Sequence, residues 1–160
     1  MIFVTVGTQI AFDRMVAVVD EWAGETGEEV FAQVGPSIGT FAHLRCAEFL
    51  KPAEFDHYFN EAKLVIAHAG MGSILSALSF GKPIIIMPRK AALGEHRNDH
   101  QMATAKRFVG KPGVSIAWDE NELAALLDKA DLITTVDGAA RISGSAPEAF
   151  LAKLRELIDR

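Results

Sequence analysis

The chain has 160 residues, of which 49% are hydrophobic and 23% charged, and this predicts one globular domain spanning residues 1–160 with a single core. The formal charge of −5 argues against a nucleic-acid partner, and no run approaches the ~20 apolar residues of a membrane span. The N-terminal MIFVTV lacks a basic leader, so we expect no signal peptide. The lone Cys46 cannot form an intrachain disulfide, which favours a cytoplasmic location, and on a predicted strand it is typically a small buried residue.

Strand-like and helix-like segments alternate along the chain, the strands as continuous apolar runs and the helices with one apolar face or a starting Pro or Asp cap. In chain order we expect strand 2–6, helix 12–24, strand 29–35, strand 44–50, helix 52–62, strand 63–67, helix 73–80, strand 82–88, helix 96–109, strand 113–118, helix 119–130 and a terminal helix 147–160. Repeated strand–helix–strand units predict an α/β fold, a Rossmann-like parallel sheet with helices on both faces.

Ligands of such sheets bind beyond the carboxyl ends of the strands. That rule directs attention to four loops that are rich in Gly or in polar side chains: 7–13, 35–39, 68–73 and 88–101.

The loop HAGMGS, residues 68–73, joins a strand to a helix. Gly70 and Gly72 permit a close approach of the backbone to a ligand, and the amides at the start of the helix suit a phosphate. Ser73 can cap the helix or donate to a phosphate oxygen, and His68 can hydrogen-bond an anion. A tight turn with an N-cap and a merely structural histidine explains the same residues, and this alternative stays open.

The first loop, VGTQIAFD, offers polar groups above the same edge of the sheet. Gly7 permits a turn, Thr8 and Gln9 carry hydrogen-bonding groups, and Asp13 can cap a helix or face a ligand. These residues alone favour the structural interpretation.

The segment PRKAALGEHRNDHQ is unusually dense in bifunctional side chains. Asn98, Asp99, His100 and Gln101 are suited to a hydroxyl-rich ligand because each forms directional hydrogen bonds. His96 and His100 would share a helical face, so a metal pair is an alternative. No Glu follows the first histidine, however, and no third ligand has a telling spacing, so we predict no metal site.

The block HAGMGSILSALSFGKPIIIMPRKAALGEHRNDHQ closely resembles the signature of the C-terminal, donor-binding domain of family 28 glycosyltransferases. VTVGTQIAFDRMV resembles the start of the short, single-domain members, which are donor-binding subunits of two-part enzymes. The resemblance covers nearly the whole chain and is weakest from about residue 131 onward.

The resemblance implies one half of a GT-B fold and a UDP-sugar donor, with no permanently bound cofactor and no metal. It implies an inverting hexosyltransferase, of N-acetylglucosaminyl or glucuronosyl type, that acts on a lipid-linked sugar acceptor in polysaccharide or glycan assembly. The partner would be a membrane-associated acceptor-binding subunit that recruits the chain from the cytoplasm to the inner face of the membrane. That partner would supply the catalytic base, so no catalytic residue is assigned here; His100 or Asp99 as the base is an alternative to their role in sugar binding. The terminal helix 147–160 either packs on its own domain or docks the partner.

Residue by residue, the resemblance places the diphosphate at His68, Ser73 and the glycine turn, and the donor-sugar hydroxyls at His100 and Gln101. Ser76 stands where related enzymes commonly carry a ribose-binding Glu, which weakens the expected ribose contact. The predicted nucleotide-sugar site comprises Gly7, Thr8, Gln9, His68, Gly70, Met71, Gly72, Ser73, Ser76, Asp99, His100 and Gln101.

Two alternatives remain. In a nicotinamide-dependent enzyme, GMGSIL would bind the dinucleotide and Arg89 would recognise a 2′-phosphate. Leu75 occupies the third glycine's position, however, and the fingerprint normally follows the first strand. The other alternative is a non-catalytic nucleotide-sugar-binding module, which Ser76 makes more plausible.

Overall fold

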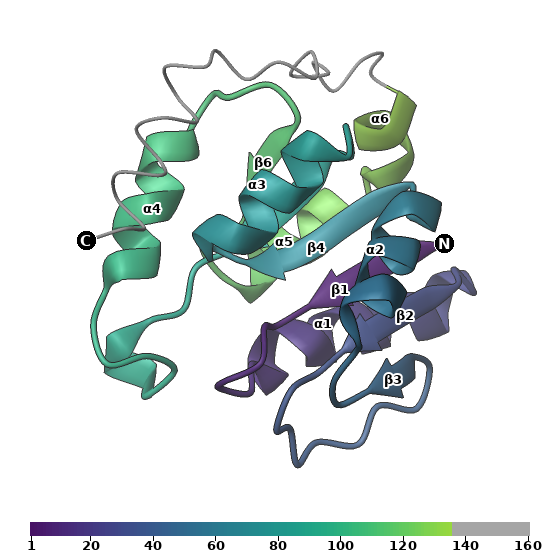
Figure 1. Ribbon diagram of the computed structural model, residues 1–160, viewed down its shortest axis with the longest axis horizontal. Coiled ribbons are helices and arrows are strands. Elements are labelled where there is room, and N and C mark those ends of the chain that lie inside the picture. Colours follow the sequence, from purple (N-terminus) through teal and green to yellow (C-terminus); the bar gives the residue numbers. More distant parts are fainter. Residues whose placement is uncertain (136–160) are drawn as a thin grey trace.

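The computed structural model describes residues 1–135, so the predicted terminal helix 147–160 lies outside the described residues. Strands and helices alternate along the chain (Figure 1). In order they are β1 (Ile2–Thr5), α1 (Asp13–Thr26), β2 (Val30–Gln33), β3 (Arg45–Ala47), α2 (Pro52–Glu61), β4 (Leu64–His68), α3 (Met71–Ser79), β5 (Ile84–Met87), the 3₁₀ helix η1 (Ala91–Leu93), α4 (His100–Phe108), β6 (Val114–Ile116), α5 (Glu120–Leu127) and α6 (Ala130–Thr135).

The strands form one six-stranded sheet in the order β3-β2-β1-β4-β5-β6, and every pairing is parallel. The predicted α/β class with a Rossmann-like parallel sheet is therefore confirmed. The chain builds outward from β1 in one direction and from β4 in the other. Because the order reverses between these two strands, the loops after β1 and β4 diverge to opposite faces and leave a crevice at their carboxyl ends.

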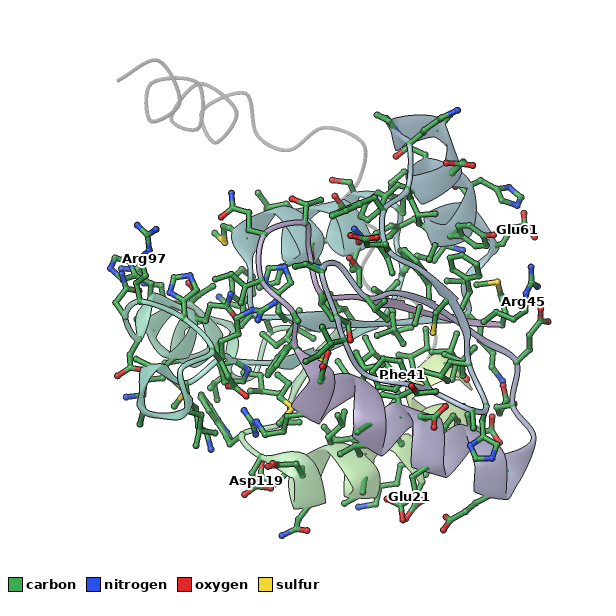
Figure 2. All side chains as sticks on the ribbon, turned by 90° about the horizontal axis from the view of Figure 1, so that it is seen from below. Glu21, Phe41, Arg45, Glu61, Arg97 and Asp119 are labelled. Atoms are coloured by element: carbon green, nitrogen blue, oxygen red, sulfur yellow. The ribbon has the colours of Figure 1, made fainter. Side chains whose placement is uncertain are left out.

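Helices cover both faces of the sheet, as Figure 1 shows. The sheet separates two cores rather than enclosing the single core expected from the sequence. Side chains alternate along β1, so Ile2 and Val4 join the first core, under α1, α5 and α6, whereas Phe3 joins the second core, under α2, α3 and α4. Figure 2 shows Phe41, from the loop after β2, lying over α1, where it packs against the first core. Within residues 1–135 no helix combines the length and apolar character needed to cross a bilayer.

Local signals place several helix boundaries correctly. Pro52 occupies the first turn of α2, and Asp119 caps α5 by accepting a hydrogen bond from the Glu122 amide at 2.9 Å, so both predictions are confirmed. The sequence pattern predicts one helix over residues 119–130. In the structure α5 ends at Leu127, and the short α6 begins at Ala130.

Three local predictions are wrong. Helix α3 begins at Met71 rather than near Ser73, because extended Gly70 is its N-cap and the chain turns helical directly afterwards. Helix α4 begins at His100 rather than at residue 96, because the Asp99 carboxylate accepts from the Ala91 amide at 3.0 Å and holds the preceding residues in turns. Cys46 is exposed rather than buried, because short β3 is the edge strand of the sheet.

Phe59 on α2 anchors the second core. Its side chain is 0% exposed and its ring centroid lies 5.3 Å from Phe3, 4.7 Å from Phe55 and 5.6 Å from Phe80. We expect Phe59→Ala to lower the free energy of unfolding by about 3–5 kcal/mol, because it leaves a cavity among these rings. Urea denaturation followed by circular dichroism measures this loss. Phe49→Ala is the control, since Phe49 is 51% exposed and its removal should cost about 0.5 kcal/mol or less. Equal losses in the two variants would contradict this account of the core.

Candidate functional site

A cavity of about 250 Å³ lies at the switch point, beyond the carboxyl ends of β1, β4 and β5. The β1–α1 and β5–α4 loops, which are distant in sequence, meet at this edge of the sheet (Figure 1). The lining residues are Val6, Gly7, Thr8, Gln9, Ile10, His68, Arg89, His96 and Gln101. Five predicted site residues thus surround one cavity: Gly7, Thr8, Gln9, His68 and Gln101.

Buried polar contacts shape the β1–α1 loop. The Thr5 hydroxyl donates to Gln33 Oε1 at 2.6 Å, and Gln33 Nε2 donates to the Gly7 carbonyl at 3.3 Å. Gly7 has a φ of +79°, and a Cβ there would lie 3.1 Å from His68 Nε2. Glycine therefore lets the loop turn sharply and bring its backbone close to the histidine. Thr8 and Gln9 follow as exposed residues at the mouth of the cavity.

The hydrogen bonds around His68 fix the proton on its ring. The Arg89 amide donates to Gln101 Oε1 at 3.1 Å, so the Gln101 Nε2 must face His68 Nδ1, which lies 3.0 Å away. Nδ1 is thus an acceptor, and the neutral ring carries its hydrogen on Nε2. That N–H lies beside Gly7 and 3.5 Å from the Ser73 hydroxyl. The site therefore presents a neutral hydrogen-bond donor that suits an anionic oxygen.

The surroundings of His68 keep it neutral. Burial is the largest cause, and together with the nearby Arg89 and His96 it lowers the pKa of His68 to about 4. His68 is consequently uncharged at neutral pH.

The two glycines of the turn differ in their surroundings. A Cβ on Gly70 would overlap the His68 ring, so glycine is required there for the histidine to keep its position. A Cβ on Gly72 would meet no atom within 4 Å, so Gly72 faces open space in the first turn of α3. Among the described residues, no side chain caps this helix, and its first amides are left to a ligand or to water.

The other predicted site residues are not part of the cavity lining: Gly70, Met71, Gly72, Ser73, Ser76, Asp99 and His100. Met71 is exposed at the start of α3, and Ser76 lies half-buried on the next turn. Asp99 is held by the Ala91 amide, and His100 is exposed at the start of α4, with its amide bonded to Asn98 Oδ1 at 3.1 Å.

The expected His96–His100 helical pair does not form, because His96 lies in the turns before α4. Within residues 1–135 no group of three or more His, Cys, Asp or Glu side chains is arranged to hold a metal ion. Figure 2 shows Arg97, from the same loop, pointing outward on the opposite side of the molecule from Arg45 and Glu61.

The sequence interpretation missed Arg89 and His96 as lining residues. Arg89 is 2% exposed, and its guanidinium donates to main-chain carbonyls of the β1–α1 loop, including Val6 at 2.8 Å and Ile10 at 2.6 Å. The sequence did contain a signal for Arg89, because this residue follows a fully apolar strand with only Pro88 between them. A charged side chain buried at such a position needs hydrogen-bond partners from the protein.

A parallel sheet in the order 3-2-1-4-5-6, with a polar cavity at its switch point, defines a Rossmann-like domain. Residues 1–141 match the model of the glycosyltransferase family 28 C-terminal domain, and the chain therefore belongs to this family. The resemblance expected from the HAGMGS block is confirmed.

Known relatives agree with this membership. The UDP-N-acetylglucosamine transferase subunit ALG13 of Eremothecium gossypii is 33% identical over 100 residues, which cover 62% of this chain and 45% of the relative. The solution structure of an ALG13 has a TM-score of 0.58 at 20% identity, covering 82% of this chain and 85% of that one. The MurG crystal structure from Acinetobacter baumannii has a TM-score of 0.66 at 18% identity, covering 96% of this chain and 49% of MurG. The chain thus spans about half the length of MurG and of the curated relative.

The low pKa of His68 makes stability depend on pH. Unfolded His68 has an ordinary pKa near 6.5, so between that value and about 4 the unfolded chain binds more protons than the folded one. This part of the free energy of unfolding is complete above pH 6.5 and is lost as the pH falls toward 4. We expect His68 to contribute a decline of about 2–3 kcal/mol across this window.

Urea denaturation at pH 7, 6 and 5 measures this decline. His68→Gln should flatten it, whereas His57→Gln, at an exposed position on α2, should leave it as in the wild type. A decline of the same steepness in His68→Gln would show that His68 is not the titrating group.

Proposed function

We propose that this chain is the donor-binding half of a two-component inverting glycosyltransferase. It would hold a UDP-sugar while its hexosyl residue, of N-acetylglucosaminyl or glucuronosyl type, passes to a lipid-linked acceptor in polysaccharide or glycan assembly. The partner would be a membrane-associated acceptor-binding subunit, which would recruit the chain to the inner face of the membrane. Family membership and the ALG13 relative, whose name describes a transferase subunit, support this proposal.

The observation that carries the proposal is the set of donors at the switch point. Neutral His68 presents its Nε2–H, Ser73 presents its hydroxyl 3.5 Å away, and α3 begins beside them with an uncapped, glycine-containing first turn. Together they suit the diphosphate of a nucleotide sugar. Gln101, on α4, would keep His68 in its donor form, and Thr8 and Gln9 would close the cavity from the β1–α1 loop.

These donors suit the departure of a diphosphate. In the proposed displacement the acceptor oxygen bonds to the anomeric carbon while the bond from that carbon to the diphosphate breaks. The diphosphate leaves with the electron pair, and the His68 Nε2–H and the amides of α3 would stabilise its growing charge. The acceptor's proton would pass to a base on the partner, so the chain would bind and orient the donor but transfer nothing alone.

The structure argues against a nicotinamide-dependent enzyme. The candidate fingerprint follows β4 rather than β1, and Arg89, the residue that would recognise a 2′-phosphate, is buried and committed to main-chain carbonyls. The non-catalytic binding module remains the second candidate. Ser76 favours it, because its hydroxyl cannot replace a carboxylate that binds both ribose hydroxyls.

Gly72 provides a test of donor binding that leaves the fold intact. Because its Cβ would enter open space within a helix, we expect Gly72→Ala to fold normally and to gain about 0.5–1 kcal/mol of stability. A diphosphate held against the first turn of α3 would meet the added methyl, so the Kd for UDP should rise about tenfold or more, equivalent to ~1.4 kcal/mol.

Isothermal titration calorimetry with UDP measures this change in Kd. Ser79→Ala, at the far end of α3, is the control and should bind UDP as the wild type does. Undiminished binding by Gly72→Ala would show that the diphosphate does not approach this turn.

Reconstitution tests the division of labour. The purified chain should bind UDP weakly and transfer no sugar, and adding an acceptor-binding subunit, sought among adjacent reading frames, should restore transfer to a lipid-linked acceptor. Deleting residues 147–160 should weaken the pull-down of that subunit if this segment docks it. Full activity of the isolated chain would refute the split site, whereas UDP binding without turnover in any mixture would favour the non-catalytic module.

A further inference from the structure

We propose that Arg89 is a positioning residue of the donor site, whose guanidinium fastens the β1–α1 loop to the β5–α4 loop and so fixes two walls of the cavity. Its importance for donor binding rests on the proposed function. The hydrogen bonds by which Arg89 fastens the two loops do not depend on the proposed function, because they are present in the free protein.

The contacts of Arg89 join segments that are distant in sequence. Its Nη2 donates to the carbonyls of Val6 and Ile10 at 2.8 and 2.6 Å, and its Nη1 donates to those of Ala11 at 2.5 Å and Glu95 at 3.4 Å. Three of these carbonyls belong to the loop that carries Gly7, Thr8 and Gln9. One side chain therefore fixes the β1–α1 loop at both its beginning and its end.

Within residues 1–135 no carboxylate forms an ion pair with Arg89, although the negative charge of nearby Glu95 acts to raise its pKa. The nearby Glu95 carboxylate is occupied by Arg14, at 2.6 and 2.9 Å, and by the Lys90 amide. The Phe12 ring lies 4.7 Å below the guanidinium. Main-chain carbonyls and an aromatic face thus solvate a cation at the edge of a cavity proposed to receive a diphosphate.

Burial lowers the pKa of Arg89 to about 10, which leaves it protonated at neutral pH. Its charge is one reason that the pKa of His68 is low, and the other charged or titratable contributor is His96. Arg89 therefore acts on the site in two ways. Its planar guanidinium holds the β1–α1 loop through hydrogen bonds. Its positive charge favours the neutral form of His68, which donates through Nε2.

Two substitutions distinguish the effect of the guanidinium on the loop from the effect of its charge on His68. Arg89→Lys retains the charge but loses the fork, since an ammonium cannot reach four carbonyls spread across a planar array. Arg89→Met loses both. Arg45→Lys is the matched control, because Arg45 also lies over a phenylalanine ring, that of Phe31, but on the far edge strand and largely exposed.

Three measurements follow. Backbone order parameters of residues 7–11, measured by NMR relaxation of the free protein, should fall from about 0.85 toward 0.6 or below in both Arg89 variants and stay unchanged in Arg45→Lys. The His68 pKa, followed through its ring resonances by NMR, should remain near the wild-type value in Arg89→Lys and rise toward 6.5 in Arg89→Met. The Kd for UDP should rise about tenfold or more in Arg89→Lys.

The outcomes separate this inference from the proposed function. Unchanged order parameters of residues 7–11 in both Arg89 variants would overturn the proposal that Arg89 holds this loop. Lower order parameters together with an unchanged UDP affinity would overturn the role in donor binding. A wild-type protein that binds no UDP would refute the proposed function, while the order parameters still decide whether Arg89 holds the loop. Should Arg89→Met fail to fold, the wild type provides the test, since a fastened guanidinium gives separate, slowly exchanging Nη protons and a free one gives a single averaged signal.

Discussion

The candidate site depends on one side-chain amide. Gln101, at the start of α4, accepts from the Arg89 amide after β5 and donates to His68 at the end of β4. A backbone amide can only donate, so the orientation of Gln101 is determined, and through it the tautomer of His68. Gln101 thereby joins the ends of β4 and β5 to the start of α4. It also leaves His68 neutral, with its remaining N–H beside the cavity. The sequence interpretation assigned Gln101 to sugar hydroxyls, whereas in the free protein its amide is engaged with His68 and the Arg89 backbone.

The location of the site is a property of the sheet, and its chemistry is a property of a few side chains. The reversal of strand order between β1 and β4 opens a crevice in any fold of this topology. On the proposed function, a histidine at the end of β4 and glycines at residues 70 and 72 would adapt this crevice to an anion. Gly70 makes room for the histidine ring, and a Cβ on Gly72 would enter open space. The HAGMGS turn therefore meets a packing requirement at Gly70, and on the proposed function it would meet a ligand-binding requirement at Gly72.

Sequence reasoning predicted the strand positions, the sheet class and three loops that line the cavity, because these follow from local patterns, whereas the predicted loop 35–39 contributes no lining residue. Continuous apolar runs such as IFVT and IIIM mark buried parallel strands whatever their neighbours are. It failed where a long-range contact decides the outcome. Asp99 delays the start of α4 through a bond to Ala91, edge position exposes Cys46, and Arg89 finds its carbonyls some 80 residues away in sequence. No periodicity encodes such contacts.

The charges at the site bear on how the proposed reaction would divide between two subunits. Within residues 1–135 the groups that line the cavity are donors and a buried cation, and no carboxylate is among them. On the proposed function, such a set would stabilise a departing diphosphate, and it holds no carboxylate to accept the proton of an attacking hydroxyl. Two histidines line the cavity, and each has a ring nitrogen that accepts a hydrogen bond within the protein: His68 Nδ1 from Gln101 and His96 Nδ1 from the Asn98 amide. A pKa near 4 further makes His68 a poor base. On the proposed function, proton acceptance therefore belongs to a second surface facing this one, and the polarity of the cavity itself argues that the chain holds only half of the chemistry.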